Sequence, residues 1–307
     1  MSKHELQKGT ISPLRGRNRT LAFQVLTVFP AVALVVLVIG YPVYYLVSLS
    51  FTNVSAFNLL NQSYRWIRFR NYQKLFNDPI FLRAIAHTLG YALGTVGVQT
   101  LLGFWLASAV YRMSRLQKTL VTTLLLFPTM VADIAGALVW RPLFDVSTGV
   151  LNYFIKALGF STVNFLGDPI LARITVMAVA VWQWTPYMFL FVLAGMESID
   201  TSLYEVAKLE GASSRVVMTR IVAPLIRPVL LVAVYFRITD SLRVFDKVFV
   251  LTGGGPGSAT ETISTYIQRT GFANMEYGLA SAGGVVMLGI AFLFGLISLK
   301  LVSAYND

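Results

Sequence analysis

The sequence predicts an all-α integral membrane protein with six transmembrane helices and one structured segment on the cytoplasmic side. Its 307 residues are 56% hydrophobic, and the mean hydropathy is +0.66. Only 13% of them are charged, against about 25% in ordinary soluble domains. A soluble chain of this length could not bury so much apolar surface, so the composition argues against a soluble enzyme.

The spans are predicted from long runs that lack Asp, Glu, Lys and Arg. The first run lies between Arg19 and Arg65, and its apolar part is about twice as long as the hydrophobic region of a signal peptide, so we expect a permanent helix. The second run contains only His87 as a titratable group, and the third contains only Asp133. The predicted organisation is a tail over 1–20 and a transmembrane domain over 21–307, with spans near 21–50, 84–111, 119–140, 174–196, 228–250 and 278–299.

The distribution of positive charge predicts the orientation of these spans. With six spans, both termini lie on one side of the membrane. Lys and Arg are about twice as dense in the segments on that side as in the segments opposite, which places both termini in the cytoplasm. The net charge of +11 is then explained by cytoplasmic loops, and we expect no nucleic-acid partner.

The connection between the fourth and fifth spans is predicted to be a short helix–turn–helix. Ser202 and Glu205 have the spacing of a capping box at the start of a helix. Gly211 suits a sharp break because glycine tolerates positive φ. A second short helix is expected over 213–221, with Pro224 marking its end.

This connection resembles the EAA loop of ATP-binding-cassette (ABC) importer permeases. The family pattern is Glu-Ala-Ala, three residues, Gly, nine residues, Ile, any residue, Leu and Pro, and this chain departs from it at Val206 and Ala223. The resemblance implies that the loop over 198–224 is a coupling helix seated on a separate ATP-hydrolysing subunit. The residues implied in that contact are Glu205, Ala207, Gly211, Ala212, Ile221 and Pro224.

Further resemblance covers most of the chain. The segments 71–88, 140–152 and 245–257 are similar to those of carbohydrate permeases on the MalF- and UgpA-like side of the sugar importers. One departure is His87, where that family commonly has Asn. The resemblance implies the type I ABC importer permease fold in a bacterial inner membrane. It also implies a homologous second permease, two ATPase subunits, an extracytoplasmic solute-binding protein and no cofactor.

The sequence contains no catalytic motif. Gly253 to Gly257 could be mistaken for a phosphate-binding loop, but such a loop ends in Gly-Lys-Ser/Thr and this one has no lysine. We therefore expect a tight turn on the outer face and no ATP hydrolysis by this chain. There is no cysteine, and His4 and His87 are the only histidines, so no metal site is expected.

Polar residues in the middle of the fourth and fifth spans are the candidates for a solute pathway, because such groups are costly in a membrane unless they are paired or face water. Aromatic rings pack on the C–H faces of sugars, and charged or amide groups bind their hydroxyls. An alternative is that Arg237, Asp240 and Arg243 form a structural ion-pair network with a neighbouring helix; Asp133 is a weaker pathway candidate. The proposed pathway residues are Gln183, Trp184, Tyr187, Arg237, Asp240 and Ser241.

The function predicted on these grounds is a permease subunit that forms the path for a sugar or a related polyol. A disaccharide, an oligosaccharide and an anionic solute such as a glycerophosphate all remain open. The alternative is a secondary transporter driven by an ion gradient. That alternative would explain Asp133 and Asp240 as acids within the membrane, but it gives no reason for the loop over 198–224.

Overall fold

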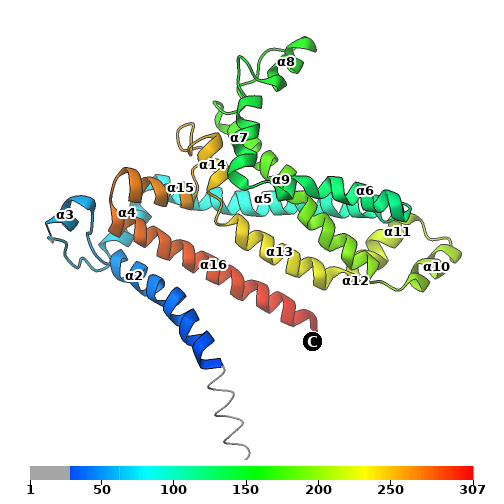
Figure 1. Ribbon diagram of the computed structural model, residues 1–307, viewed down its shortest axis with the longest axis horizontal. Coiled ribbons are helices and arrows are strands. Elements are labelled where there is room, and N and C mark those ends of the chain that lie inside the picture. The colour runs from blue at the N-terminus through cyan, green and yellow to red at the C-terminus, as the bar shows by residue number, and fades with distance from the viewer. Residues whose placement is uncertain (1–27, 62, 307) are drawn as a thin grey trace, which may run out of the picture.

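The apolar runs of the sequence form long helices that lie side by side along the longest axis of the molecule (Figure 1). The structure is a computed structural model and describes residues 28–61 and 63–306. The elements, with short π- or 3-10-helical turns labelled η, are η1 (Val36–Gly40), α2 (Tyr41–Ser50), α3 (Ala56–Leu60), α4 (Arg70–Asn77), α5 (Pro79–Val110), α6 (Arg115–Leu126), η2 (Phe127–Met130), α7 (Asp133–Leu143), α8 (Val150–Ala157), α9 (Pro169–Glu197), α10 (Thr201–Leu209), α11 (Ser214–Val216), η3 (Val217–Val222), α12 (Ala223–Leu225), α13 (Arg227–Ser241), α14 (Asp246–Leu251), α15 (Ile263–Gln268), η4 (Arg269–Ala273) and α16 (Tyr277–Asn306).

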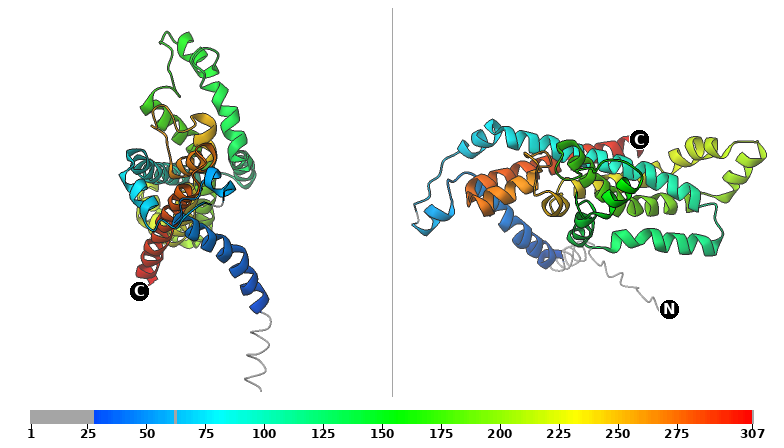
Figure 2. Two further views of the ribbon diagram at one scale, coloured as in Figure 1. Left: turned by 90° about the vertical axis from the view of Figure 1, so that its left-hand side faces the viewer. Right: turned by 90° about the horizontal axis from the view of Figure 1, so that it is seen from above.

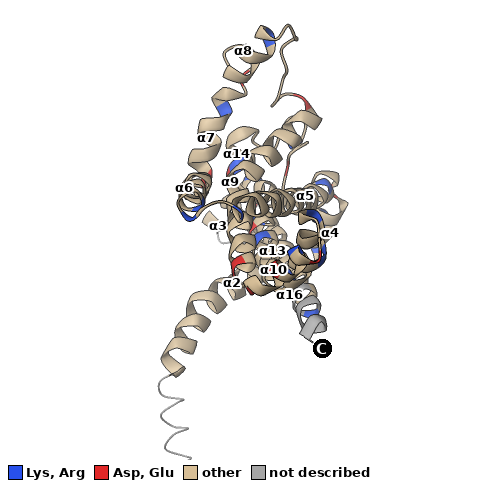
Figure 3. Ribbon diagram, turned by 90° about the vertical axis from the view of Figure 1, so that its right-hand side faces the viewer, with Lys and Arg blue, Asp and Glu red and all other residues tan. Residues whose placement is uncertain are grey.

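Four helices are long and apolar enough to cross a membrane alone, and two bent helix pairs bring the number to as many as six. Charged residues occupy only small parts of the ribbon in Figure 3. The predicted all-helical membrane fold is confirmed, whereas the tail over 1–20 and the first residues of the first predicted span lie outside the described residues. The candidate spans are Val28–Ser50, Pro79–Val110, Pro169–Glu197 and Tyr277–Ile297, with the bent pairs Arg115–Met130 plus Asp133–Leu143 and Ser214–Leu225 plus Arg227–Ser241.

The first span diverges from the rest of the bundle. Its α2 end contacts α16, but the opposite end of the helix points away from the other helices in Figure 1 and in the left view of Figure 2. None of the residues in the most apolar window of Val28–Ser50 is buried within the chain. The hydrophobic side chains of this apolar window therefore face lipid or another subunit rather than this chain's own core.

Helices α5 and α9 are the central pair, and an Asp-Pro sequence starts each of them. Asp78 Oδ1 accepts a hydrogen bond from Ile80 N at 2.8 Å, and Asp168 Oδ1 accepts from Ile170 N and Leu171 N, both at 2.9 Å. An acceptor at the cap, followed by a proline that needs no donor, is a strong helix start. Both helices consequently begin earlier than the expected positions near 84 and 174.

A glycine allows the central pair to approach backbone to backbone. A Cβ atom added to Gly103 would lie 2.7 Å from Phe189 N and 2.9 Å from Met188 Cβ, so only glycine fits there. Met188 and Phe189 are fully buried against this contact. Small residues at a helix crossing are the usual means of close packing inside a membrane.

The third predicted span is a bent pair. Helix α6 and the following turn meet α7 at 91°, and the bend contains Pro128, which removes a backbone donor. Helices α7 and α8 then project from the bundle as an arm (Figure 1). The end of the arm is held by Asn152, whose Nδ2 donates to Val163 O at 2.9 Å and whose Oδ1 accepts from Val163 N at 2.8 Å.

The fifth predicted span is divided. Helix α13 ends at Ser241, and α14 starts at Asp246 as a separate element that contacts α7 and α9. The expected continuous span over 228–250 is therefore broken after its first two thirds. The break has a physical reason: this stretch carries five charged side chains, and the turn lets them face a common polar cavity instead of lipid.

Candidate functional site

The elements α7, α9, α13 and α14 meet around a polar cavity of about 340 Å³. A volume of this order is within the range of small-molecule sites in proteins. Tyr91 of α5 also lines the cavity, and Trp184 of α9 contributes an aromatic side chain. The remaining lining is dominated by six charged side chains, which are Asp133, Arg237, Asp240, Arg243, Asp246 and Lys247.

Arg237 is the central cation of the cavity and is only 4% exposed. Its guanidinium carbon lies 4.4 Å from the centre of the Trp184 ring, a cation–π arrangement. Its Nη1 forms an ion pair with Asp240 Oδ2, three residues further along α13. The cation is therefore held between an aromatic face and a carboxylate.

A third contact of Arg237 comes from Gln99 on α5. Arg237 Nε donates to Gln99 Oε1 at 3.2 Å, and Gln99 Nε2 donates to Ala180 O of α9 at 3.1 Å. The Gln99 side chain is fully buried, so both hydrogen bonds are shielded from water and fix its orientation. Gln99 is absent from the predicted pathway residues, although an amide in the middle of an otherwise apolar span is a signal that could have identified it.

Lys247 and Asp133 form a second ion pair at the cavity wall. Lys247 Nζ lies 2.7 Å from Asp133 Oδ1, and the two side chains are 3% and 34% exposed. Trp184 Nε1 donates to the same carboxylate at 3.3 Å. Asp133 is the first residue of α7, where the helix dipole favours a negative charge. A buried lysine requires such a partner because an unpaired buried charge is strongly destabilising.

Four of the six predicted pathway residues line the cavity: Trp184, Arg237, Asp240 and Ser241. Gln183 and Tyr187 are not part of its lining. Gln183 is fully buried, and its Nε2 donates to Val131 O at 2.6 Å at the bend before α7. The Tyr187 ring packs on Phe191 at 4.8 Å between centroids.

The ion pairs of Asp240 do not join α13 to a neighbouring helix. Both of its partners, Arg237 and Arg243 at 3.9 Å, are three residues away along the chain. The alternative prediction, an ion-pair network with a neighbouring helix, is therefore not what these ion pairs form. The contacts between helices are those of Arg237 with Gln99 on α5 and with Trp184 on α9.

A second candidate site is the loop between α9 and α13. Helix α10 starts after Asp200, whose Oδ1 accepts from Ser202 N at 2.9 Å. The predicted capping box of Ser202 and Glu205 is therefore wrong, because Asp200 and not Ser202 occupies the cap position. Hydrogen bonding from the backbone and the side chain of Ser202 holds the pKa of Asp200 below its ordinary value.

Gly211 makes the sharp break that the sequence predicts. Its φ is +76°, a value that L-residues with a side chain rarely adopt. Gly211 N donates to Lys208 O at 3.1 Å and Ala212 N donates to Ala207 O at 2.9 Å, which closes the end of α10. The second helical segment runs from Ser214 to Leu225 as α11, η3 and α12, so it continues past Pro224 before the bend into α13.

The predicted coupling residues divide between the surface and the core. Ala207 is buried among Val222 and Ile226. The exposed members offer a surface to a partner, and Val206 and Leu209 of α10 are also exposed, at 54% and 88%. Among the predicted set, Glu205, Gly211 and Pro224 are exposed, and Ala212 and Ile221 are partly buried.

The loop is attached to the bundle by an aromatic and charged cluster. The rings of Tyr204 and Tyr111 lie 5.3 Å apart, and Lys118 Nζ lies 5.0 Å from the Tyr111 ring. Lys118 also pairs with Glu197 at 2.9 Å, and Tyr204 OH donates to Met196 O at 3.3 Å. These contacts join α10 to the ends of α5 and α9 and to the start of α6.

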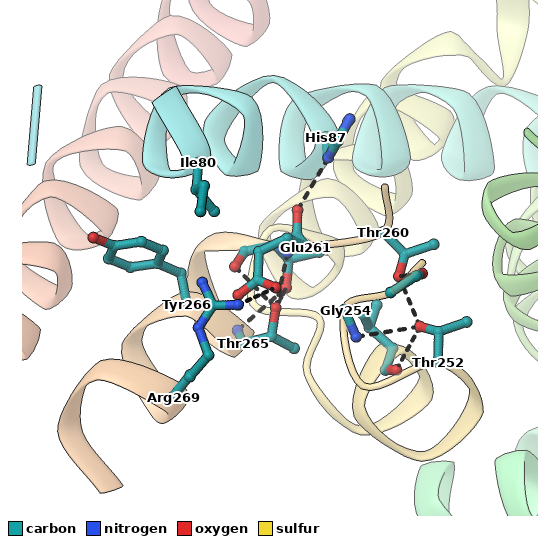
Figure 4. A network of polar contacts seen from close by, with 12 residues as sticks. Ile80, His87, Thr252, Gly254, Thr260, Glu261, Thr265, Tyr266 and Arg269 are labelled. Atoms are coloured by element: carbon teal, nitrogen blue, oxygen red, sulfur yellow. Dashed lines mark hydrogen bonds and ion pairs between the residues drawn. The ribbon is translucent and has the colours of Figure 1, made fainter. Parts of the chain in front are cut away.

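The glycine-rich turn after α14 encloses a carboxylate (Figure 4). Glu261 is 2% exposed, and its Oε2 pairs with Arg269 at 3.2 Å. A Cβ atom at Gly254 would collide with this carboxylate, so the acid lies directly against the turn. A negative charge in this place repels phosphate. His87 contacts the Glu261 carbonyl oxygen through Nδ1 at 3.2 Å.

Comparisons with known proteins identify the family to which the chain is similar. The profile described as "Binding-protein-dependent transport system inner membrane component" matches residues 99–307. The trehalose/maltose transport system permease protein MalF of Thermococcus litoralis is 35% identical over 237 residues, which are 76% of this chain and 79% of that protein. The sulfoquinovosyl glycerol transport system permease protein SmoG of Agrobacterium fabrum is 32% identical over 285 residues, 93% of this chain and 91% of that protein. A crystal structure of a bacterial ABC transporter that imports the acidic polysaccharide alginate has a chain with the same fold, with a TM-score of 0.82 and 24% identity over 96% of this chain and 99% of that one.

Proposed function

Since the chain belongs to the binding-protein-dependent transport system inner membrane components, the permease subunits of ABC importers, we propose that its charged cavity is the passage for a sugar. The chain is a multi-pass inner-membrane protein, and ATP is hydrolysed by separate subunits. The ion-gradient-driven alternative is set aside by this family membership.

The observation that carries the sugar proposal is the pairing of Trp184 with Arg237 and Asp240 in one cavity. An aromatic face beside charged hydrogen-bonding groups is a combination suited to the apolar C–H surface and the hydroxyls of a sugar. The relatives add support, because they are named for trehalose or maltose and for sulfoquinovosyl glycerol. They leave the charge of the solute open.

The complete transporter is proposed to contain this chain, a homologous second permease, two ATPase subunits and an extracytoplasmic solute-binding protein. The loop of α10 to α12 and the C-terminal end of α16 lie toward the same end of the bundle, and α3 and α4 lie at the other (Figure 1). Together with the distribution of Lys and Arg, this supports cytoplasmic termini and a cytoplasmic loop. Closure of the ATPases around nucleotide would then move α10 and switch the cavity between the two sides of the membrane.

The test is ATP-dependent uptake of trehalose and maltose by the complete transporter in proteoliposomes. We expect Trp184→Ala to abolish uptake while the complex still assembles. The matched control is Trp105→Ala, because Trp105 is 68% exposed on α5 and lies outside the cavity lining. Unchanged uptake by the Trp184 variant would overturn the assignment of the cavity.

A further inference from the structure

The cavity contains equal numbers of positive and negative side chains. Its cations are Arg237, Arg243 and Lys247, and its acids are Asp133, Asp240 and Asp246. The formal charge of the lining is therefore zero, although the chain as a whole has a net charge of +11. A site built for an anionic solute would instead be expected to hold an excess of donors and cations.

The two buried cations are already neutralised. Lys247, at 3% exposed, is paired with Asp133 at 2.7 Å. Arg237, at 4% exposed, is paired with Asp240 and is further held by Gln99. An entering anion could bind either cation only by displacing its carboxylate, and that exchange would leave a carboxylate of the cavity without its counter-ion.

The third cation does not change this balance. Arg243 is 63% exposed and lies 3.9 Å from Asp240, so solvent screens its charge. Asp246 faces the same cavity, and no ion pair is found for it within residues 63–306. Arg243 is therefore the most exposed cation of the cavity, and Asp246 adds an acid for which the described residues provide no ion pair.

We propose that the cavity selects uncharged polyhydroxylated solutes and that Asp133 is the residue that sets this preference by neutralising Lys247. This inference rests on the proposed function of the cavity as a sugar passage. A hydroxyl group both donates and accepts, so a neutral sugar can donate to a carboxylate and accept from the adjacent cation without separating the pair. An ionised phosphate, sulfonate or carboxylate group can only accept hydrogen bonds. Its negative charge would also be repelled by the three acids of the cavity.

The experiment measures equilibrium binding to the purified permease–ATPase complex in the absence of the solute-binding protein. The probes are trehalose and trehalose 6-phosphate, which differ only by the anionic group. The unaltered complex should bind trehalose at least about tenfold more tightly, because placing like charges together is costly. Equal or tighter binding of the phosphate would overturn the proposal.

Two variants test the role of Asp133 itself. Asp133→Asn keeps the shape of the side chain and an acceptor for Trp184 Nε1, but it leaves Lys247 without its counter-ion, so the preference for the neutral sugar should fall or reverse. The double variant Asp133→Asn with Lys247→Gln removes both charges and should restore the preference. It also remains informative if the single variant folds poorly, because it contains no unpaired buried charge.

The outcomes separate the inference from its premise. A binding ratio unchanged in Asp133→Asn, or a double variant that does not recover the preference, would overturn the role of Asp133. If the unaltered complex bound neither probe and transported no sugar, the proposed function itself would be overturned. Binding of trehalose with an unaltered ratio in every variant would overturn the inference alone.

Discussion

The guanidinium carbon of Arg237 lies 4.4 Å from the centre of the Trp184 ring, which joins α13 to α9 at the wall of the cavity. Arg237 belongs to the bent fifth span, and Trp184 belongs to the central pair of helices. A movement of α13 relative to α9 would therefore disturb the cation–π contact. The contact is preserved only if the two helices move together. The proposed solute passage therefore depends on the relative position of these two helices.

Gln99→Leu should impair solute binding without preventing membrane insertion. The substitution removes the acceptor for Arg237 Nε and the donor to Ala180 O. Leaving a buried donor or acceptor without a partner costs about 1–3 kcal/mol, so Arg237 should lose its fixed orientation over Trp184. The measurement is sugar affinity together with the thermal unfolding midpoint, and Leu101→Ala, at a residue 73% exposed on the same helix, is the control. Wild-type affinity in the Gln99 variant would show that Asp240 and Trp184 hold Arg237 unaided.

Gly211→Pro should uncouple ATP hydrolysis from transport. Proline holds φ near −65°, whereas Gly211 has φ +76° and donates its N–H to Lys208 O. The end of α10 would have to rearrange, and the exposed face of this helix would no longer be presented to an ATPase. The ratio of uptake to ATP hydrolysis in the reconstituted complex is the quantity to measure.

Gly159 provides a matched control for that substitution. It has φ +87° and donates its N–H to Lys156 O at 2.9 Å, so proline there carries the same backbone penalty in the arm after α8. We expect Gly159→Pro to lower stability but to preserve the ratio of uptake to ATP hydrolysis. Loss of coupling in both variants would mean that the effect is general destabilisation and not a property of the loop.

Tyr204→Leu should also reduce coupling, and by a different route. The ring pair of Tyr204 and Tyr111, at 5.3 Å, joins α10 to the end of α5. Aromatic pairs of this kind contribute about 0.5–1.5 kcal/mol beyond their buried area. Without the pair, α10 could move while α5 remained in place, so ATP hydrolysis should continue while uptake falls.

A mutant cycle separates the pair from its individual members. Tyr204→Phe keeps the ring contact and removes only the hydrogen bond to Met196 O, so it should retain most of the coupling. The double variant Tyr111→Leu with Tyr204→Leu should be no worse than the more damaging single one, because residues in contact are not additive. If the losses of coupling in the two single variants simply added in the double variant, the two tyrosines would act independently and not as a pair.

Hydropathy predicted most of the fold. The long charge-free runs became helices because a spanning segment must satisfy its backbone internally. The bend at Pro128 and the break after Ser241 were not predicted, because both depend on how a turn meets other helices. Gln183 donates to Val131 O at the first of these, a contact that no single-sequence pattern reports.

The candidate site was predictable where depth in the membrane and charge coincide, as for Arg237 and Asp240. The depth argument could not separate Trp184, which lines the cavity, from Gln183, which packs against the bend. Lys247 was visible only as a charge in an irregular span, because its pairing with Asp133 joins residues 114 positions apart. Position along a helix thus indicates depth, whereas the direction of a side chain depends on its neighbours.

Glu261 should make the stability of the glycine-rich turn depend on pH. Burial raises the pKa of this carboxyl above its ordinary value of 4.5, and Arg269 opposes the rise only in part. The folded protein then binds the proton more tightly than the unfolded chain. The free energy of unfolding should therefore decrease as the pH rises from 4.5 through the raised pKa and should level off above it. Glu261→Gln cannot ionise, so the difference in thermal midpoint between the variant and the unaltered protein should be smallest at the acidic end and grow with pH. A difference that does not vary with pH would mean that Glu261 keeps one protonation state throughout, and that its role at Gly254 is purely steric.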